Sequence, residues 1–427
     1  MSVDSDVLVV GGGLAGSMAA LAAARADRGA TVGLVSDGET TLRAASGLID
    51  VLGYTPDGEG PLRDPFEAIP DLPTEHPYPT VGLEAVREGL ALFDDVAGDA
   101  YRGGHTGLNA LVPTAGGATK PTARYPTAVA PGLAARTDDM LLVGFEDSTA
   151  MDAHLVADRL QAAGVPFSTT GVTVRFPADG TAESPVPAMA AALDANEPVP
   201  DTGGEDSARS VRTALAEAIY TYHQSQGRVG LPAVLGRTEH EAIRDTIADH
   251  LDADVFEVPL GPPSIPGRRL GTLLTAALER DGVEVTDGRV TDVETTEDAV
   301  EGVVLGDGDE RLEAGAFVLA TGGLTGGGIR SDRTSVREPL FGCHVEAPPD
   351  RYDWFDDEFF GTHPFARFGV RTDDQLRPLD SDGTPEFDNL RAAGAVLGGY
   401  DLAAEKSGSG VSIATGYVAG CRAAKTR

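Results

Sequence analysis

The chain has 427 residues, enough for two or three domains with a large apolar core. Its formal net charge is −34, and its 67 acidic residues are scattered along the whole length, which favours a solvated surface adapted to high salt over one acidic block that faces a basic partner. This balance argues against nucleic-acid binding, because contacts to phosphates need a basic face.

Cysteine usage and the N-terminal segment bear on cofactors and location. Cys343 and Cys421 lie far apart and match no C-x-x-C spacing, so we expect no metal, iron–sulfur or dithiol site in this chain. So few cysteines suit a reducing cytoplasm. The acidic start MSVDSD lacks the pattern of a signal peptide, and no apolar run approaches the roughly 18 residues of a membrane span. We expect a cytoplasmic protein that reaches a membrane only through a partner.

The first predicted element is a buried strand that ends in Gly11-x-Gly13-x-x-Gly16, followed by a helix from about Leu14 to Ala26. In this context Gly11 makes the tight turn, Gly13 lets a pyrophosphate approach the backbone, and Gly16 lets helix and strand pack closely. The helix N-terminus adds free N–H groups and a partial positive charge. A second strand at Thr31–Val35 completes a βαβ unit, which predicts a nucleotide-binding start.

The end of the second strand is less typical. A dinucleotide site usually places an acid there, about 20 residues after the glycines, to hold the ribose hydroxyls. Ser36 occupies that position and Asp37 follows it. A slip of one residue reverses the side-chain direction unless the strand has already ended. Phosphate binding is therefore predicted, whereas recognition of an adenosine half stays open.

The middle of the chain has a different texture, with clusters of Pro, Asp and Gly from about Thr55. Its helical and strand-like stretches predict an inserted α/β domain over residues 55–260. The predicted helices are Leu83–Val96, Ala150–Ala163 and about Ser207–Gln224, and the predicted strands are Leu141–Phe145, Val172–Phe176 and one in VGLPAVLG.

From Pro259 the pattern tightens again. A helix at Arg268–Arg280 precedes strands at Val283–Thr286, Arg289–Thr295 and Val300–Gly306. A buried strand, AFVLA, ends in TGGLTGGG, and the last segment holds NLRAAGAVLGG and a small-residue helix. We therefore predict a βαβ start over residues 1–54, the inserted substrate or cap region over 55–260, and a return to the first domain over 261–427.

The ordered motifs GGGLAG, AASG, FVLATGG and NLRAAGAVLGG resemble the flavoproteins with two dinucleotide-binding domains, in the branch of fumarate reductase and succinate dehydrogenase. SGLIDVLG, EHPYP, PPSIPGRRL, VREPLFG, FGVRTDDQLRP and AVLGGYD narrow the resemblance to the B subunits of anaerobic glycerol-3-phosphate dehydrogenase. The fold that this implies is α/β and Rossmann-like, with an inserted α/β cap domain.

The resemblance implies an assembly that oxidises glycerol 3-phosphate to dihydroxyacetone phosphate. Two flavoproteins, the catalytic A subunit and the B subunit, join an iron–sulfur C subunit, which docks at the inner face of the membrane and passes electrons to quinone. The family suggests FMN as the cofactor of the B subunit and the fold suggests FAD. Ser36 keeps FMN open, because FMN has no adenosine ribose to hold.

The resemblance also assigns cofactor residues. The three motif glycines would cradle phosphate, a loop would pass the isoalloxazine ring, two strand ends would face the nucleotide, and the last helix would point its N–H groups at the flavin O2 edge. These residues are, in that order, Gly11, Gly13 and Gly16; Ser46 and Gly47; Thr321, Gly322 and Gly394; and Ser409, Gly410 and Val411.

Oxidation of a hydroxyl needs a base, and the substrate phosphate needs a cation. His363 beside Arg367 is the preferred base and anchor, with Arg337 as a second anchor. His344 is another candidate base, Arg268 and Arg269 are other candidate anchors, and His76 suits a turn. Each arginine alone more often forms a salt bridge, and each histidine alone is more often structural.

Two other functions stay open. The first is a flavin relay or scaffold, with catalysis in the A subunit, because no base and anchor pair stands out in the sequence. The second is a fumarate-reductase-like oxidoreductase that acts on a dicarboxylate.

Overall fold

The computed structural model describes residues 3–38, 40–178, 185–199, 209–306, 310–359 and 361–426. The chain forms two compact units. The first comprises residues 1–41, 49–98 and 273–427, and the second comprises residues 42–48 and 99–272.

A seven-stranded sheet forms the centre of the first unit, in the order β13-β2-β1-β16-β15-β14, with β19 also paired to β16. The strands β13, β2, β1, β16 and β19 run parallel, whereas β15 and β14 form an antiparallel extension. The strand bounds are β1 Val3–Val10, β2 Val32–Ser36, β13 Glu284–Asp287, β14 Val290–Thr295, β15 Val300–Leu305, β16 Glu310–Leu319 and β19 Leu390–Ala392.

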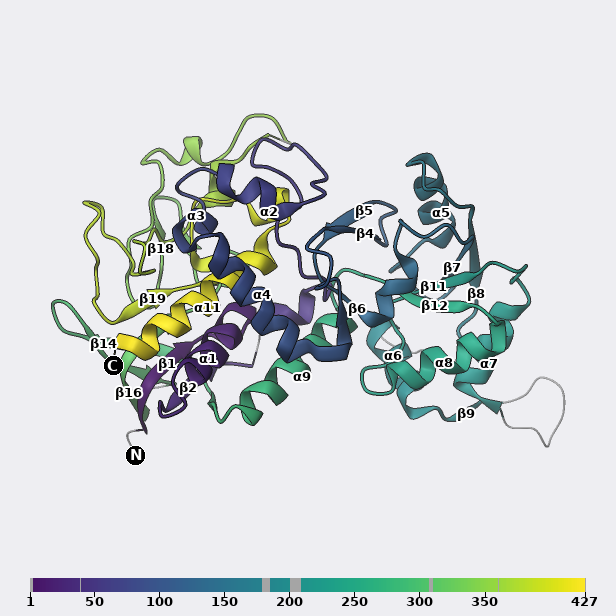
Figure 1. Cartoon of the computed structure of the whole chain (residues 1–427), viewed down its shortest axis with the longest axis horizontal. Helices are drawn as coiled ribbons and strands as arrows, with labels where there is room; N and C mark the ends of the chain where they lie inside the picture. Colours follow the sequence, from purple (N-terminus) through teal and green to yellow (C-terminus); the bar gives the residue numbers. More distant parts are fainter. Residues whose placement is uncertain are drawn as a thin grey trace. The chain divides into compact units, whose positions relative to one another are not determined.

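Three helices pack beside one another over this sheet, α1 (Leu14–Ala26), α4 (Leu83–Ala97) and α11 (Gly408–Thr426) (Figure 1). Small residues permit the close approach of α1 and α11. A Cβ on Gly416 would lie 2.4 Å from the Ala15 carbonyl oxygen, and one on Gly420 would lie 2.0 Å from that of Ala19. The glycine- and alanine-rich last helix is therefore shaped to fit the first one.

Short elements complete the first unit. They are α2 Pro65–Ala68, η2 Ile69–Asp71, α3 Pro77–Val81, β17 Arg330–Ser331, β18 Val336–Arg337, η5 Arg351–Trp354, η6 Pro364–Arg367, η7 Gly394–Val396 and α10 Leu402–Glu405.

The second unit is built on a parallel four-stranded sheet in the order β12-β11-β7-β8. The strands β7 and β11 are buried along their whole length. Their apolar side chains form one core together with those of the surrounding helices. The sheet and helix bounds are β7 Met140–Phe145, β8 Thr169–Val174, β11 Arg228–Pro232, β12 Asp254–Val258, α5 Ala153–Ala162, α6 Pro185–Ala195, α7 Val211–Tyr220 and α8 His240–Leu251.

Small two-stranded sheets and a short helical turn belong to the same unit. They are β3 Tyr101–Arg102 with β6 Tyr125–Pro126, β4 Ala110–Pro113 with β5 Thr119–Thr122, β9 Pro198–Val199 with β10 Arg209–Ser210, and η4 Thr127–Gly132. Three elements span the limits of the units, η1 Thr41–Ala44, η3 Gly98–Ala100 and α9 Ile265–Arg280.

The predicted α/β class and the βαβ start are confirmed, and α1 has the predicted bounds. The predicted helix at about Ser207–Gln224 is shorter, Val211–Tyr220, and its first residues lie outside the described part of the chain. Helix α4, expected in the insertion, belongs to the first unit because it packs on α11, with Gly89 close to Ala414. The role of residues 55–260 as a substrate or cap region stays a prediction.

Candidate functional site

A cavity of about 420 Å³ lies in the first unit at the carboxyl ends of β1, β2 and β16. Parallel α/β sheets bind ligands at this edge, where loops from several strands meet. The wall consists of Val10–Gly13, Val35–Asp37, Thr40, Thr41, Gly288–Thr291, Ala320–Gly322, Gly326–Gly328, Arg330 and Glu338–Leu340.

The three motif glycines have different surroundings, and of the three Gly11 and Gly13 line the cavity. Gly11 has a φ of +116°, and a Cβ there would lie 2.3 Å from the Ala320 carbonyl oxygen. A Cβ on Gly16 would lie 1.8 Å from the Gly11 oxygen, so both positions are closed by backbone. Gly13 differs, because a Cβ there would meet nothing within 4 Å. Gly13 also begins α1 with no side-chain cap, which leaves the helix N-terminus open toward a phosphate.

The end of β2 shows whether an acid is available to hold ribose hydroxyls, given that Ser36 occupies the usual position of that acid. The strand stops at Ser36, whose Oγ lies 2.4 Å from where a Cβ on Gly12 would be. Asp37 is outside the strand, so the alternation of side chains no longer governs its direction, and it also lines the cavity. An acid is therefore present at the cavity wall one residue later than usual.

A buried hydroxyl in the wall points to a ligand. Thr321 Oγ1 is buried and has no hydrogen-bond partner among the described residues. Gly322 beside it has a φ of +87°, and a Cβ on Gly328 would lie 2.0 Å from the Gly322 oxygen. A buried polar atom without a partner costs free energy, which a bound hydroxyl or phosphate oxygen would recover.

The cavity wall carries charges of both signs, from Arg289, Arg330, Asp37 and Glu338. Arg289 and Arg330, both exposed, supply the two cations of the wall. Glu338, also in the wall, is 1% exposed and accepts hydrogen bonds from the amides of Leu340 (2.9 Å) and Phe341 (2.7 Å). Burial raises the pKa of Glu338, although these amides act in the opposite direction. The cavity therefore fits a group with both phosphates and ribose hydroxyls.

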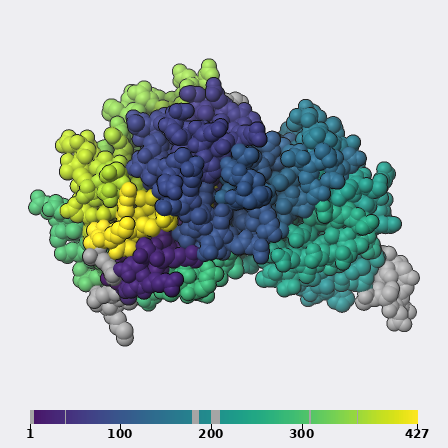
Figure 2. Space-filling model, viewed as in Figure 1, coloured from purple at the N-terminus to yellow at the C-terminus, as the bar shows by residue number. Residues whose placement is uncertain are grey.

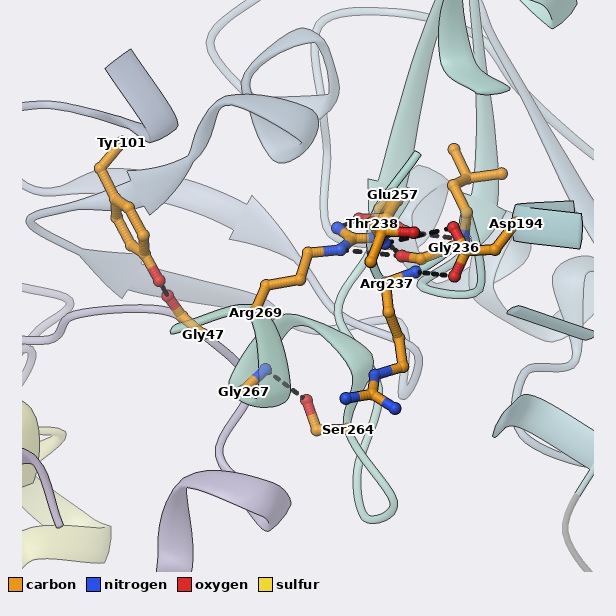
Figure 3. A network of polar contacts seen from close by, with 11 residues as sticks. Gly47, Tyr101, Asp194, Gly236, Arg237, Thr238, Glu257, Ser264, Gly267 and Arg269 are labelled. Atoms are coloured by element: carbon orange, nitrogen blue, oxygen red, sulfur yellow. Dashed lines mark hydrogen bonds and ion pairs between the residues drawn. The ribbon is translucent and has the colours of Figure 1, made fainter. Parts of the chain in front are cut away.

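Ser46 and Gly47, the expected isoalloxazine loop, belong to the second unit and do not line this cavity. Gly47 has a φ of +78°, and its carbonyl oxygen accepts a hydrogen bond from the Tyr101 hydroxyl at 2.8 Å (Figure 3). The Ser46 Oγ accepts from the Leu48 amide at 3.4 Å. Their contact with a flavin stays a prediction.

The expected C-terminal cofactor residues are engaged within the chain. Gly394, with a φ of +79°, donates its amide to Thr415 Oγ1 at 2.9 Å and packs on Ala15. At the start of α11, the Gly410 amide donates to the backbone carbonyl oxygen of Asp50 at 2.8 Å.

Two further residues of this helix start were expected to face the flavin. The Val411 amide donates to the Ser407 oxygen at 2.9 Å, and Ser409 lies shortly before it in the first turn of α11. None of these C-terminal residues lines the cavity, and their flavin contacts stay predictions.

Both ring nitrogens of His363 are engaged by its own loop. Nδ1 accepts from the Asp356 amide at 3.0 Å, and Nε2 lies 3.2 Å from the Phe359 oxygen. Because Nδ1 accepts, the proton of the neutral ring sits on Nε2 and is donated to Phe359. As placed, the ring has no vacant lone pair for a substrate proton. Arg367, its predicted companion, has a buried Nε without a partner among the described residues.

Arg337 is exposed on β18, opposite Arg330 of β17, and does not line the cavity. The neighbouring Glu338 and the cross-strand Arg330 do line it, and sequence reasoning missed both. Glu338 lies in the motif VREPLFG, and Arg330 follows TGGLTGGG, so both stand in motifs that the sequence had singled out. The pairing register of β17 and β18, which decides which side chains face the cavity, could not be predicted from the sequence.

The other candidate anchors and bases, Arg269, Arg268 and His344, do not line the cavity. Arg269 forms two hydrogen bonds to the buried Glu257 carboxylate, at 2.6 and 3.0 Å, and two more to the Gly236 carbonyl oxygen (Figure 3). Arg268 has a buried Nε without a described partner, and His344 is exposed.

His76 begins α3 as a capping residue, because its Nδ1 accepts from the Tyr78 amide at 3.1 Å. Its Nε2 lies 3.1 Å from the buried Glu405 carboxylate. The expected turn role of His76 is confirmed.

Within the described ranges, no three His, Cys, Asp or Glu side chains are grouped to hold a metal ion. In the same part of the chain, no helix combines the length and apolar character that crossing a membrane requires.

The sequence is similar to those of known flavin-binding proteins. The model of the FAD binding domain family matches residues 6–411. A Halobacterium salinarum protein, named as a probable B subunit of anaerobic glycerol-3-phosphate dehydrogenase, is 55% identical over 428 residues, which cover 100% of this chain and 99% of that one. A Vibrio cholerae protein, named as the B subunit of the same dehydrogenase, is 31% identical over 432 residues, covering 96% and 94%. A solved flavocytochrome c3 fumarate reductase is 14% identical, with a TM-score of 0.45 over 100% of this chain and 79% of that one.

Proposed function

Because the chain belongs to the family of anaerobic glycerol-3-phosphate dehydrogenase B subunits and carries an FAD binding domain, we propose that it is the flavin-binding subunit of a glycerol-3-phosphate:quinone oxidoreductase. The single observation that supports this most is the match over nearly the full length of relatives with that name.

FAD is the cofactor that the family model indicates. The cavity supports it, since the wall continues from the open Gly13 past Asp37 to Gly288–Thr291, which gives room beyond the phosphates. FMN is the alternative that the sequence resemblance suggested, and it would leave that end of the cavity unused. Bound flavin would supply the hydride acceptor for oxidation of the substrate C2 hydroxyl.

In this proposal the chain's own residues orient the substrate and receive the hydroxyl proton. Arg367 is the preferred anchor for the substrate phosphate, because its buried Nε lacks a described partner. Arg337, exposed on its hairpin, is the weaker anchor. His363 serves as the base only after its ring leaves one of its two backbone hydrogen bonds.

The proposed partners are a second flavoprotein, the catalytic A subunit, and an iron–sulfur protein, the C subunit. The names of the relatives, which designate a B subunit, support an assembly. The iron–sulfur partner would pass electrons to quinone and hold this chain at the inner face of the membrane.

A flavin relay without catalysis is the second candidate, and the engaged nitrogens of His363 favour it. To separate the two, the chain is purified in high salt alone and with the A and C subunits. The flavin is then released and identified, and dye reduction by glycerol 3-phosphate is assayed in each preparation. Dye reduction by the chain alone supports catalysis here. Bound FAD with dye reduction only in the presence of the A subunit supports the relay, and a chain without flavin in every preparation contradicts both.

A further inference from the structure

Exposed aromatic side chains gather in one segment of the first unit. Among the described residues, six tyrosine or phenylalanine side chains are largely exposed, and four of them lie between residues 352 and 365. We call these four the aromatic patch: Tyr352 (72% exposed), Phe355 (43%), Phe359 (85%) and Phe365 (43%). A phenylalanine that is 85% exposed adds little to folding, and clustered apolar exposure marks interaction sites.

The backbone that carries the aromatic patch is held by specific hydrogen bonds. Trp354 Nε1 donates to the Pro348 oxygen at 2.7 Å. His363 ties two further points together, since it accepts from the Asp356 amide and contacts the Phe359 oxygen. Light-green atoms of this part of the chain lie on the face seen in Figure 2. A surface fixed in this way loses little conformational freedom on binding.

Charge around the aromatic patch narrows the choice of occupant. The segment carries five exposed carboxylates and one arginine, Arg351, which lies over the Tyr352 ring at 6.0 Å. The carboxylates are Asp350, Asp353, Asp356, Asp357 and Glu358. This rim would repel an anionic membrane surface and a second copy of this acidic chain. It fits a protein that borders an apolar recess with arginine or lysine.

We propose that the aromatic patch docks another protein of the assembly, one that presents an apolar recess with a basic border. The identification of that protein as a member of the same complex rests on the proposed function. On this account His363 is the residue that holds the docking segment in shape, whether or not it also acts in chemistry.

The test compares two double variants in the full complex. Phe355→Ser/Phe359→Ser removes two of the four rings of the aromatic patch, and Tyr220→Ser/Tyr222→Ser is the matched control, because these tyrosines are 59% and 48% exposed in the second unit. Each chain is purified in high salt and mixed with the A and C subunits, and the mass of the complex is measured by light scattering across a concentration series. We expect at least tenfold weaker assembly for the patch variant, normal assembly for the control, and unchanged flavin content in both.

A second variant tests the charged rim. Asp357→Lys/Glu358→Lys should also weaken assembly, because it reverses the attraction to a basic border. Normal assembly of both the Phe355→Ser/Phe359→Ser variant and the Asp357→Lys/Glu358→Lys variant would overturn the inference. So would equal loss in the tyrosine control, or a loss confined to self-association or to binding of anionic phospholipid vesicles. If the wild-type chain binds neither of the two partner proteins, the proposed function fails, and this occupant fails with it.

Discussion

Gly13 and Gly16 belong to one motif but meet different surroundings. At Gly16 the missing side chain makes room for the Gly11 carbonyl, so the requirement for glycine arises from the fold itself. At Gly13 nothing stands within reach, so the requirement arises from whatever occupies the cavity. Single substitutions can therefore separate folding from ligand binding at positions three residues apart.

Gly13→Ala should leave the fold intact, because a φ of −75° suits any residue and the added methyl group meets no protein atom. We expect FAD affinity to fall at least about tenfold, or ~1.4 kcal/mol, since the methyl group would stand where a phosphate approaches. Flavin fluorescence titration and thermal melting check the two quantities. Gly16→Ala is the control and should lower stability by about 1–3 kcal/mol through overpacking. Unchanged FAD affinity in Gly13→Ala would place the phosphate elsewhere.

His363 links two roles that kinetics can separate. We expect His363→Ala to keep its flavin and to lose turnover in the complex when partner proteins are limiting, because the docking segment loses its ties to Asp356 and Phe359. As a general base His363 would add about 10²–10⁴-fold to the rate, and that loss would persist at saturating partner. Turnover is measured over a range of partner concentrations. Wild-type turnover throughout would exclude both roles.

At the scale of elements, one helix caps another in the second unit. Asp194 of α6 accepts hydrogen bonds from the amides of Arg237 and Thr238 (Figure 3). It also accepts one from the amide of Glu239, and all three residues precede α8. Glu239, the residue before α8, gives no side-chain cap of its own. Burial acts to raise the pKa of Asp194, but the three amides outweigh it and the pKa is lowered overall.

This capping contact predicts a pH dependence with a defined sign. A lowered folded-state pKa stabilises the protein above the unfolded value of about 3.9, and the stabilisation is lost as pH falls below it. Asp194→Ala should therefore cost about 0.5–2 kcal/mol near neutral pH, with a smaller difference from wild type as the pH falls below about 4. Denaturant unfolding at several pH values measures this, with the exposed Asp249→Asn as the control. A difference that stays constant with pH would contradict the assignment.

Elements with a strong local pattern could be predicted from sequence. The run Val7–Val10 before three glycines specifies β1, the turn and α1 through nearest neighbours alone, and the structure reproduces them. Placement of α4 with α11 could not be predicted, because Gly89 and Ala414 meet only in the folded chain. Site residues divide in the same way. The motif glycines could be predicted from the sequence. The hydrogen bonds of the His363 ring and the hairpin register that brings Glu338 to the cavity could not, because both depend on tertiary contacts.

At the scale of the whole molecule, the net charge of −34 sets the conditions for stability. Repulsion among carboxylates is felt over about 10 Å at 0.1 M salt and about 3 Å at 1 M salt. The melting temperature should therefore rise steadily when KCl is increased across this range. Differential scanning fluorimetry measures it, with sucrose as a non-ionic control. A melting temperature that does not change with KCl would contradict a fold whose stability is limited by charge repulsion, whereas a rise in sucrose reports only its general stabilising effect.

Anaerobic titration of the reconstituted complex tests whether this chain is a flavin subunit that serves glycerol 3-phosphate oxidation. Glycerol 3-phosphate is added to the FAD-loaded chain with its partner proteins, and the flavin absorbance is followed before and after addition of fumarate. We predict that glycerol 3-phosphate bleaches the oxidised flavin and that fumarate does not restore it. A flavin that glycerol 3-phosphate never bleaches and that fumarate reoxidises after chemical reduction would contradict the account.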